Sequence, residues 1–99
     1  MTALNDLLKV FDLEEAPINA VQHNPQNITL SIDEKTFEKI IEKLKDEKFI
    51  FRGLTDSNNS IRLHFMYNSD PLKIELITLK VFSQTPEFKK NIDRVFSSQ

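Results

Sequence analysis

The 99-residue sequence contains no cysteine, no tryptophan and a single glycine. Without cysteine the chain forms no disulfide and no thiolate-ligated metal site, and it uses no thiol in catalysis. One glycine is too few for the glycine-rich loops that cradle phosphates in nucleotide-binding proteins. No stretch approaches the roughly 18 apolar residues that a membrane-spanning helix needs, so we expect no membrane contact.

Charge is spread unevenly along the chain, although the net charge is only −2. Residues 1–33 carry one lysine against five acidic residues, a net charge of −4, whereas residues 34–99 have a net charge of +2. This difference is either ordinary surface variation or the sign of an acidic arm that folds onto the body or onto a partner. We divide the chain into an N-terminal segment, residues 1–27, and one α+β domain, residues 28–99.

The start of the sequence lacks a basic region followed by an apolar run, so it does not resemble a secretory signal. We therefore expect a cytoplasmic protein. The abundance of asparagine, lysine and isoleucine favours a bacterial or phage origin.

The N-terminal segment is predicted to hold one amphipathic helix and a loop. Leu4, Leu7, Leu8 and Phe11 recur at helical spacing, with Thr2 as the cap and an end near Leu13. Residues 14–27 contain two prolines and no clear period, which predicts a loop with a turn at Asn24-Pro25.

The remaining residues predict a strand, a helix, three strands and a final helix. Residues 28–32 alternate apolar and polar side chains, and Asp33 is a good cap for a helix over 34–48. Apolar runs at 49–55, 61–67 and 72–82 are separated by short, turn-rich segments, which indicates an antiparallel meander. Thr85-Pro86-Glu87 is typical of a helix start. We predict an α+β fold with an antiparallel sheet of three to four strands, two helices on one face and the N-terminal amphipathic helix.

Alternation along the strands predicts which side chains share each face of the sheet. One face is assigned to the core and carries Phe49, Phe51, Ile61, Leu63 and Phe65. The second face carries Ile50, Arg52, Leu54, Arg62, His64 and Met66. This face is too apolar for an ordinary solvated surface, so the N-terminal helix or another chain covers it, unless it is simply exposed.

The last strand changes phase between Leu76 and Ile77. Leu72, Ile74 and Leu76 are in step, whereas Ile77, Leu79 and Val81 are in step one residue later. Either a β-bulge shifts the register there, or the strand is central and buried on both faces.

An enzymatic interpretation rests on His64, which would act as a base beside Arg52 and Arg62 in a small nuclease or hydrolase site. Because any short polar strand contains such a set, we assign no catalytic residue. His23 lies in the predicted loop, where a histidine is usually solvent-exposed and idle. The acidic residues of the helix over 34–48 alternate with lysines, as on a solvated face, so we assign no metal ligand and no cofactor.

Nucleic-acid binding is a second alternative. The order of elements over residues 33–98 is similar to that of double-stranded-RNA-binding domains, although the dense lysine cluster at the start of the last helix is missing. Phosphate contacts would come from basic residues of the sheet and last helix: Arg52, Arg62, Lys73, Lys80, Lys89, Lys90 and Arg94.

The sequence favours a small non-enzymatic protein–protein interaction module, such as an adaptor, inhibitor or regulatory protein. A second copy of the chain is the expected partner, because symmetric dimers are the commonest assemblies. The residues predicted to bind the partner combine the second sheet face with the stripe of the first helix: Ile50, Arg52, Leu54, Arg62, His64, Met66, Leu4, Leu8 and Phe11.

Overall fold

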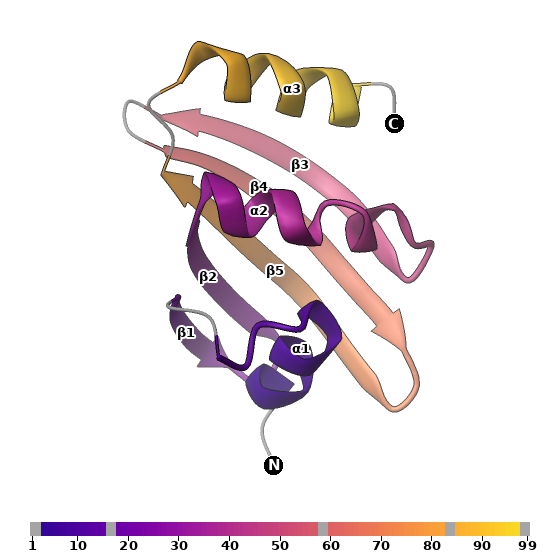
Figure 1. Ribbon diagram of the computed structural model, residues 1–99. Coiled ribbons are helices and arrows are strands. Elements are labelled where there is room, and N and C mark those ends of the chain that lie inside the picture. Colours follow the sequence, from indigo (N-terminus) through magenta and orange to yellow (C-terminus); the bar gives the residue numbers. More distant parts are fainter. Residues whose placement is uncertain (1–2, 16–17, 58–59, 83–84, 98–99) are drawn as a thin grey trace.

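The computed structural model describes residues 3–15, 18–57, 60–82 and 85–97. Within them the chain forms an α+β fold, as predicted (Figure 1). Its elements are α1 (Ala3–Phe11), β1 (Asn19–Asn24), β2 (Asn27–Asp33), α2 (Glu34–Ile40), a short 3-10 helix (Lys43–Lys45), β3 (Phe49–Ser57), β4 (Ser60–Ser69), β5 (Leu72–Phe82) and α3 (Pro86–Ser97).

The strands form one five-stranded mixed sheet in the order β1-β2-β5-β4-β3. Neighbours pair antiparallel except β2 and β5, which run parallel from Asn27 opposite Leu76 to Asp33 opposite Phe82. The predicted antiparallel sheet of three to four strands is therefore wrong in detail. The meander β3-β4-β5 is confirmed. Its last strand, β5, pairs with β2, which lies far away in the sequence, so no local turn signal could predict this pairing.

β1 lies in a segment that was predicted to be a loop, residues 14–27. It pairs with β2 from Asn19 opposite Ser31 to Asn24 opposite Asn27. The predicted turn at Asn24-Pro25 is confirmed, and the Gln26 N–H donates to Asn24 Oδ1 at 2.9 Å. The polar composition of this edge strand gave no alternating pattern, so its structure depends on pairing with β2.

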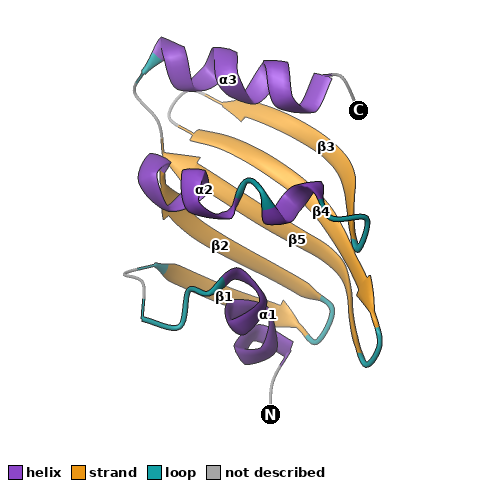
Figure 2. Ribbon diagram, turned by 45° about the vertical axis from the view of Figure 1, so that its right-hand side comes forward, coloured by secondary structure: helices purple, strands orange, loops and turns teal. Residues whose placement is uncertain are grey.

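All three helices pack on one face of the sheet (Figures 1 and 2). The Phe11 ring of α1 stacks on Phe49 of β3 at 5.2 Å, and the Phe96 ring of α3 stacks on Phe51 at 5.1 Å. Phe37 of α2 meets Phe88 of α3 edge-on at 5.5 Å, so the helices also contact one another. The predicted core residues of β3 and β4 lie under this layer. No helix of the described residues covers the other face.

The predicted helix over 34–48 is shorter in the structure. Asp33 caps α2 as predicted and accepts the Thr36 N–H at 2.7 Å. Hydrogen bonds from the Thr36 side chain and backbone hold the pKa of Asp33 below its usual value. α2 ends at Ile40, and the following 3-10 turn still buries Leu44 in the core.

The ends of α1 and α3 are fixed by local hydrogen bonds. Asp12 adopts a positive φ of 60° after α1, with its N–H bonded to the Lys9 carbonyl and the Leu13 N–H bonded to the Leu8 carbonyl. This is a Schellman motif. The predicted cap Thr2 lies outside the described residues. α3 begins at Pro86 as predicted, and the Thr85 hydroxyl donates to Glu34 Oε1 of α2 at 2.9 Å.

Two register shifts decide which side chains face the helices. In β5 the shift lies opposite Met66, because Phe65 pairs with Ile77 but Tyr67 pairs with Ile74. The phase change predicted near Leu76 is therefore a bulge, and it occurs in a strand that is also central. The second shift lies in β3, where Phe51 pairs with Phe65 but Gly53, with φ of 154°, pairs with His64.

Candidate functional site

The sheet face opposite the helices, which we call the open face, is organised as rows of side chains across the strands. One row is Asn19, Ser31, Lys80, Arg62 and Thr55. The next row is Val21, Thr29, Thr78, His64 and Gly53. None of these ten residues is acidic. The rows lie on the open face because, on the central strands, the neighbours of these residues, such as Leu30, Leu63 and Leu79, are buried beneath the helices.

Histidines and threonines of the open face are joined by hydrogen bonds across the strands. His64 Nδ1 lies 3.2 Å from Thr78 Oγ1 of β5, and His64 Nε2 lies 3.2 Å from Thr55 Oγ1 of β3. On β1, His23 Nε2 lies 2.9 Å from Thr29 Oγ1 of β2. Both ring nitrogens of His64 are therefore engaged by hydroxyl groups, which is the environment of a fixed polar network rather than of a free base.

The centre of the open face is hollowed. A shallow depression of about 430 Å³ is lined by the two histidines, the two cations and the small polar side chains between them: Val21, His23, Thr29, Ser31, Arg62, His64, Thr78 and Lys80. These residues come from β1, β2, β5 and β4. The hollow thus exists only after four strands have assembled.

Two cations stand side by side at this hollow. Arg62 and Lys80 are direct cross-strand partners between β4 and β5. Neither takes part in the salt bridges of the described residues, which join Lys45 to Glu42, Lys73 to Asp70 and Lys89 to Asp56. Lys80 Nζ lies 5.0 Å from the ring centroid of Phe82. Like charges placed directly opposite destabilise a sheet, so an anion between them relieves repulsion.

The next row of the open face, beyond His64, is apolar. Ile50 of β3 pairs with Met66 of β4, and Leu76 lies across from Met66 in the bulge of β5. Ile50 is 39% exposed. The open face therefore grades from an apolar group, Ile50, Met66 and Leu76, to the basic pair, Arg62 and Lys80, with His64 between them.

Most predicted residues of the second sheet face are found on the open face. Ile50, Arg62, His64 and Met66 lie there. Arg52 is exposed at the bulge in β3, where it has no register partner. Leu54 was placed wrongly: it pairs with Leu63 and lines a small cavity with Phe51 and Phe96 on the helix side. The extra residue at the bulge turns Leu54 over.

The first helix does not cover the open face. Phe11 is only 1% exposed and belongs to the core under the helix layer, and Leu4 and Leu8 pack against that core half-buried. The N-terminal helix as a cover for the second sheet face was therefore a wrong expectation. The aromatic partner Phe49 explains the choice of side, since stacking against it buries both rings.

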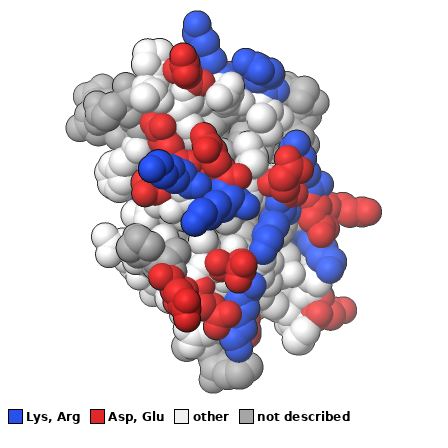
Figure 3. All heavy atoms as spheres, in the orientation of Figure 1, with Lys and Arg blue, Asp and Glu red and all other residues white. Residues whose placement is uncertain are grey.

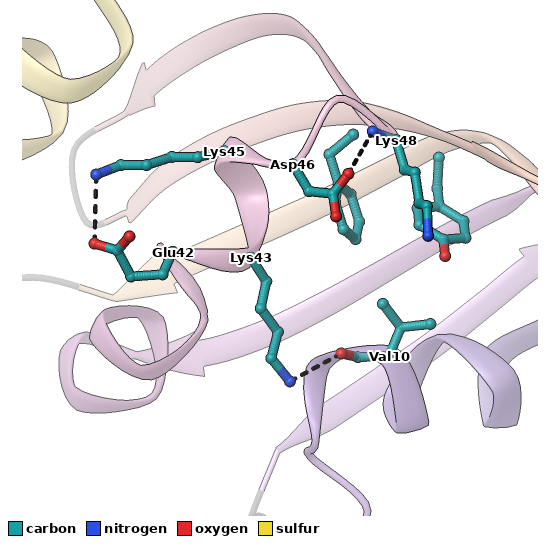
Figure 4. A pocket seen from close by; sticks show the side chains of 8 residues that line it. Val10, Glu42, Lys43, Lys45, Asp46 and Lys48 are labelled. Carbon is teal, nitrogen blue, oxygen red and sulfur yellow. Dashed lines mark hydrogen bonds and ion pairs between the residues drawn. The ribbon is translucent and has the colours of Figure 1, made fainter.

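A second hollow, of about 530 Å³, lies on the helix side between α1 and the turn after α2 (Figure 4). Its polar groups are used to hold the fold: Lys43 Nζ donates to the Val10 carbonyl at 3.0 Å, and Asp46 Oδ1 accepts the Lys48 N–H at 3.0 Å. On this side of the molecule acidic and basic groups are interspersed (Figure 3). The polar groups of this hollow are therefore used within the fold.

The basic residues of the nucleic-acid alternative are divided between two faces. Arg62 and Lys80 lie on the open face, whereas α3, which carries Lys89 and Lys90, packs on the helix side. Lys89 is also paired with Asp56 at 3.5 Å. These residues do not form one continuous basic surface.

The described part of the structure contains no cluster of side chains that could bind a metal ion. No group of three or more histidine or acidic side chains gathers there. The backbones of His23 and His64 are three strand spacings apart, roughly 14 Å. Among the described residues, no helix is long and apolar enough to span a membrane.

Sequence reasoning missed the hydroxyl groups and His23. Thr29 and Ser31 were visible as the polar positions of an alternating strand. Thr78 was hidden inside an apolar run, and His23 stood in a segment without a strand signal. Only the assembled sheet brings them together.

Comparisons with known proteins identify no family for this chain. No protein-family model matches the chain, and a comparison with curated proteins finds no match by sequence. Among solved structures, it is similar to a chain of the membrane-bound sulfane sulfur reductase, an archaeal respiratory membrane complex, with 13% identity and a TM-score of 0.48. The match covers 81% of this chain and 51% of the other. This chain thus spans about half the length of that one.

Proposed function

We propose that the protein is a small non-enzymatic binding module that contacts a partner protein through the open face. The observation that carries the proposal is a sheet face that none of the described helices covers. It combines exposed apolar side chains with two cations that form no salt bridge within the described part of the chain. Methionine and arginine are enriched in protein interfaces, and the apolar group provides area that a partner can bury. An adaptor, inhibitor or regulatory role fits such a module.

The charge of the open face favours an acidic partner over a second copy of the chain. Two copies packed through the hollow would bring Arg62 and Lys80 of one face against the same residues of the other, with no acid in either row. A partner that carries carboxylates or other anions there, and apolar side chains opposite Ile50 and Met66, complements both ends of the face. Self-association, the expectation from sequence, becomes an outcome of the test.

The environment of His64 supports binding rather than catalysis. Both ring nitrogens are within hydrogen-bond distance of threonine hydroxyls, and neither threonine is an acid that would orient a catalytic imidazole. The nuclease interpretation therefore has no support from the hydrogen bonds of its proposed base.

Site-specific photo-crosslinking tests the proposal. A photoreactive residue at position 66 of the full chain is expected to join a host protein through an acidic segment, mapped by mass spectrometry. The same residue at position 90 of α3 is the matched control and should not form that product. Arg62→Glu should abolish the position-66 product, whereas Lys90→Glu should leave it unchanged.

The result that overturns the proposal is equal labelling from both positions, or a product that survives Arg62→Glu. Crosslinks from position 66 to a second copy, together with a concentration-dependent dimer in light scattering, would replace the acidic partner by self-association.

A further inference from the structure

We infer that the hollow of the open face is an oxyanion subsite that takes a phosphomonoester carried by the partner. The inference rests on the proposed function, because it places the phosphate on the protein that binds the open face. Arg62 and Lys80 form one side of the subsite, and the hydroxyls of Thr29 and Thr78 form the other.

The spacing of the strands places these side chains within reach of one oxyanion. Adjacent strands are about 4.8 Å apart, and the two rows are separated by two residues along each strand, about 7 Å. The guanidinium of Arg62 offers several donors in a planar fork that matches two phosphate oxygens, and Lys80 adds a point charge beside it. The absence of carboxylates from both rows means that no acidic side chain there competes for these cations.

The hydrogen-bond network links anion binding to protonation of His64. A neutral imidazole accepts at one nitrogen and therefore uses the hydroxyl proton of either Thr55 or Thr78. A protonated imidazole donates at both nitrogens, so both hydroxyl protons are released for other acceptors. The hydroxyl of Thr78 can then donate to the phosphate, next to the positive charge of the ring.

Other charged and titratable groups around His64 act on the same equilibrium. Arg62 and Lys80 lie in the neighbouring row, and Arg52 lies at the bulge in β3, so the charged groups nearest to His64 are cationic. His23 on β1 bonds to Thr29 in the same way as His64 bonds to Thr78. A bound dianion offsets these positive charges, so we expect anion binding and proton uptake to favour each other.

A phosphomonoester fits the open face better than a nucleic acid. Neither row contains a phenylalanine, tyrosine or tryptophan on which a base could stack, and the half-exposed Phe82 ring beyond Lys80 lies against the Lys80 ammonium group. The basic residues of α3 lie on the helix side, so the cations of the hollow do not extend into a track along a backbone. A single dianionic group meets both cations at one point.

Nuclear magnetic resonance titrations of the full-length protein provide the test. The probes are inorganic phosphate, an acidic peptide with one phosphoserine, and the same peptide with serine. We expect shift changes at Thr29, His64 and Thr78 with the first two probes, and at least tenfold weaker binding of the serine peptide. Arg62→Gln and Lys80→Gln should each weaken the phosphopeptide about tenfold, since a charge-assisted hydrogen bond is lost. Lys90→Gln, on α3, should not.

Sulfate stays a dianion from pH 5.5 to 8. Any change in its affinity over this range therefore reports a change in the charge of the protein and not of the probe. Sulfate should bind more tightly as the pH falls, and His64→Gln, which keeps hydrogen-bonding capacity but does not titrate, should flatten that dependence. An unchanged slope would overturn the role of His64. A far-ultraviolet spectrum and amide shifts like those of the wild type establish that each variant is folded.

Other results separate the subsite from the proposed function. If neither phosphate nor phosphopeptide shifts the hollow, but crosslinking at position 66 still depends on Arg62, the phosphate inference fails and the binding function stands. An oligonucleotide could instead bind more tightly than the phosphopeptide, with a slope of log K against log salt concentration that indicates more than two neutralised phosphates. Both proposals would then give way to nucleic-acid binding.

Discussion

Gly53 is the only glycine of the chain, and its backbone predicts what happens when it is replaced. It occupies the bulge of β3 with φ of 154°, a conformation that side-chain-bearing residues rarely adopt. A Cβ built there meets no atom within 4 Å, so space is not the constraint. Gly53→Ala therefore tests backbone strain alone, without a steric clash.

The expected cost is about 1–3 kcal/mol of unfolding free energy, the usual penalty for holding a non-glycine residue in such a region. For a domain of this size that corresponds to a melting temperature lower by roughly 4–20 °C. Urea denaturation followed by circular dichroism measures the free energy directly. Gly53→Ser should lose a similar amount, because its larger side chain also enters open space.

Arg52→Ala is the matched control, since Arg52 is an exposed neighbour at the same bulge and surface substitutions usually change stability by less than about 0.5 kcal/mol. Wild-type stability in Gly53→Ala would refute the bulge geometry. It would also remove the reason why Leu54 faces the helices.

Three further substitutions test the packing and capping of the helices. Asp12→Gly should raise the unfolding free energy by a few tenths to about 1 kcal/mol, because glycine takes the positive φ after α1 more readily; a loss measured by urea denaturation would contradict the Schellman geometry. Phe11→Ala should cost about 3–5 kcal/mol, whereas Phe82→Ala, at a half-exposed ring, should cost much less; similar losses would place α1 outside the core. Asp33→Asn keeps the cap acceptor but removes the charge. Because folding lowers the pKa of Asp33, the wild type should be more stable than the variant at pH 7. The difference in unfolding free energy should vanish as the pH falls through about 4 and below. A difference that persists in acid would show that the charge of Asp33 is not its cause.

Local patterns predicted the elements whose partners are adjacent in sequence. The strands of the meander β3-β4-β5 are apolar runs separated by short turns, so their pairing followed from hairpin rules. Proline at the first position of α3 and Asp33 before α2 are start signals that operate within one helical turn. Such signals act through nearby backbone atoms, and they do not depend on the remainder of the fold.

The errors came from interactions that only the assembled sheet provides. β1 has the composition of a loop and becomes a strand by pairing with β2. The parallel pairing of β2 with β5 joins segments that are separated by α2 and two strands. Leu54 was misplaced because strict alternation was continued through Gly53, although an isolated glycine within a strand is a recognised sign of a bulge.

Only the part of the candidate site that lies on β4 could be predicted from the sequence. His64, Arg62 and Met66 lie on a strand of unbroken alternation and were placed on the correct face. Their partners Thr29 and Thr78 belong to strands whose neighbours in space are distant in sequence.

The composition of β5 on the open face indicates what kind of cover the sheet accepts. A central strand sandwiched between two apolar layers is apolar on both sides, yet β5 presents Thr78 and Lys80 to the open face. An apolar helix laid over them would bury an ammonium group without a partner, at a cost that exceeds the gain from covering Ile50 and Met66. The open face thus carries both partly exposed apolar side chains, Ile50 and Met66, and a cation, Lys80, that an apolar cover would leave without a partner. A partner that is apolar at one end and anionic at the other satisfies both, whereas the stripe of α1, which is purely apolar, does not, and α1 packs on the opposite side.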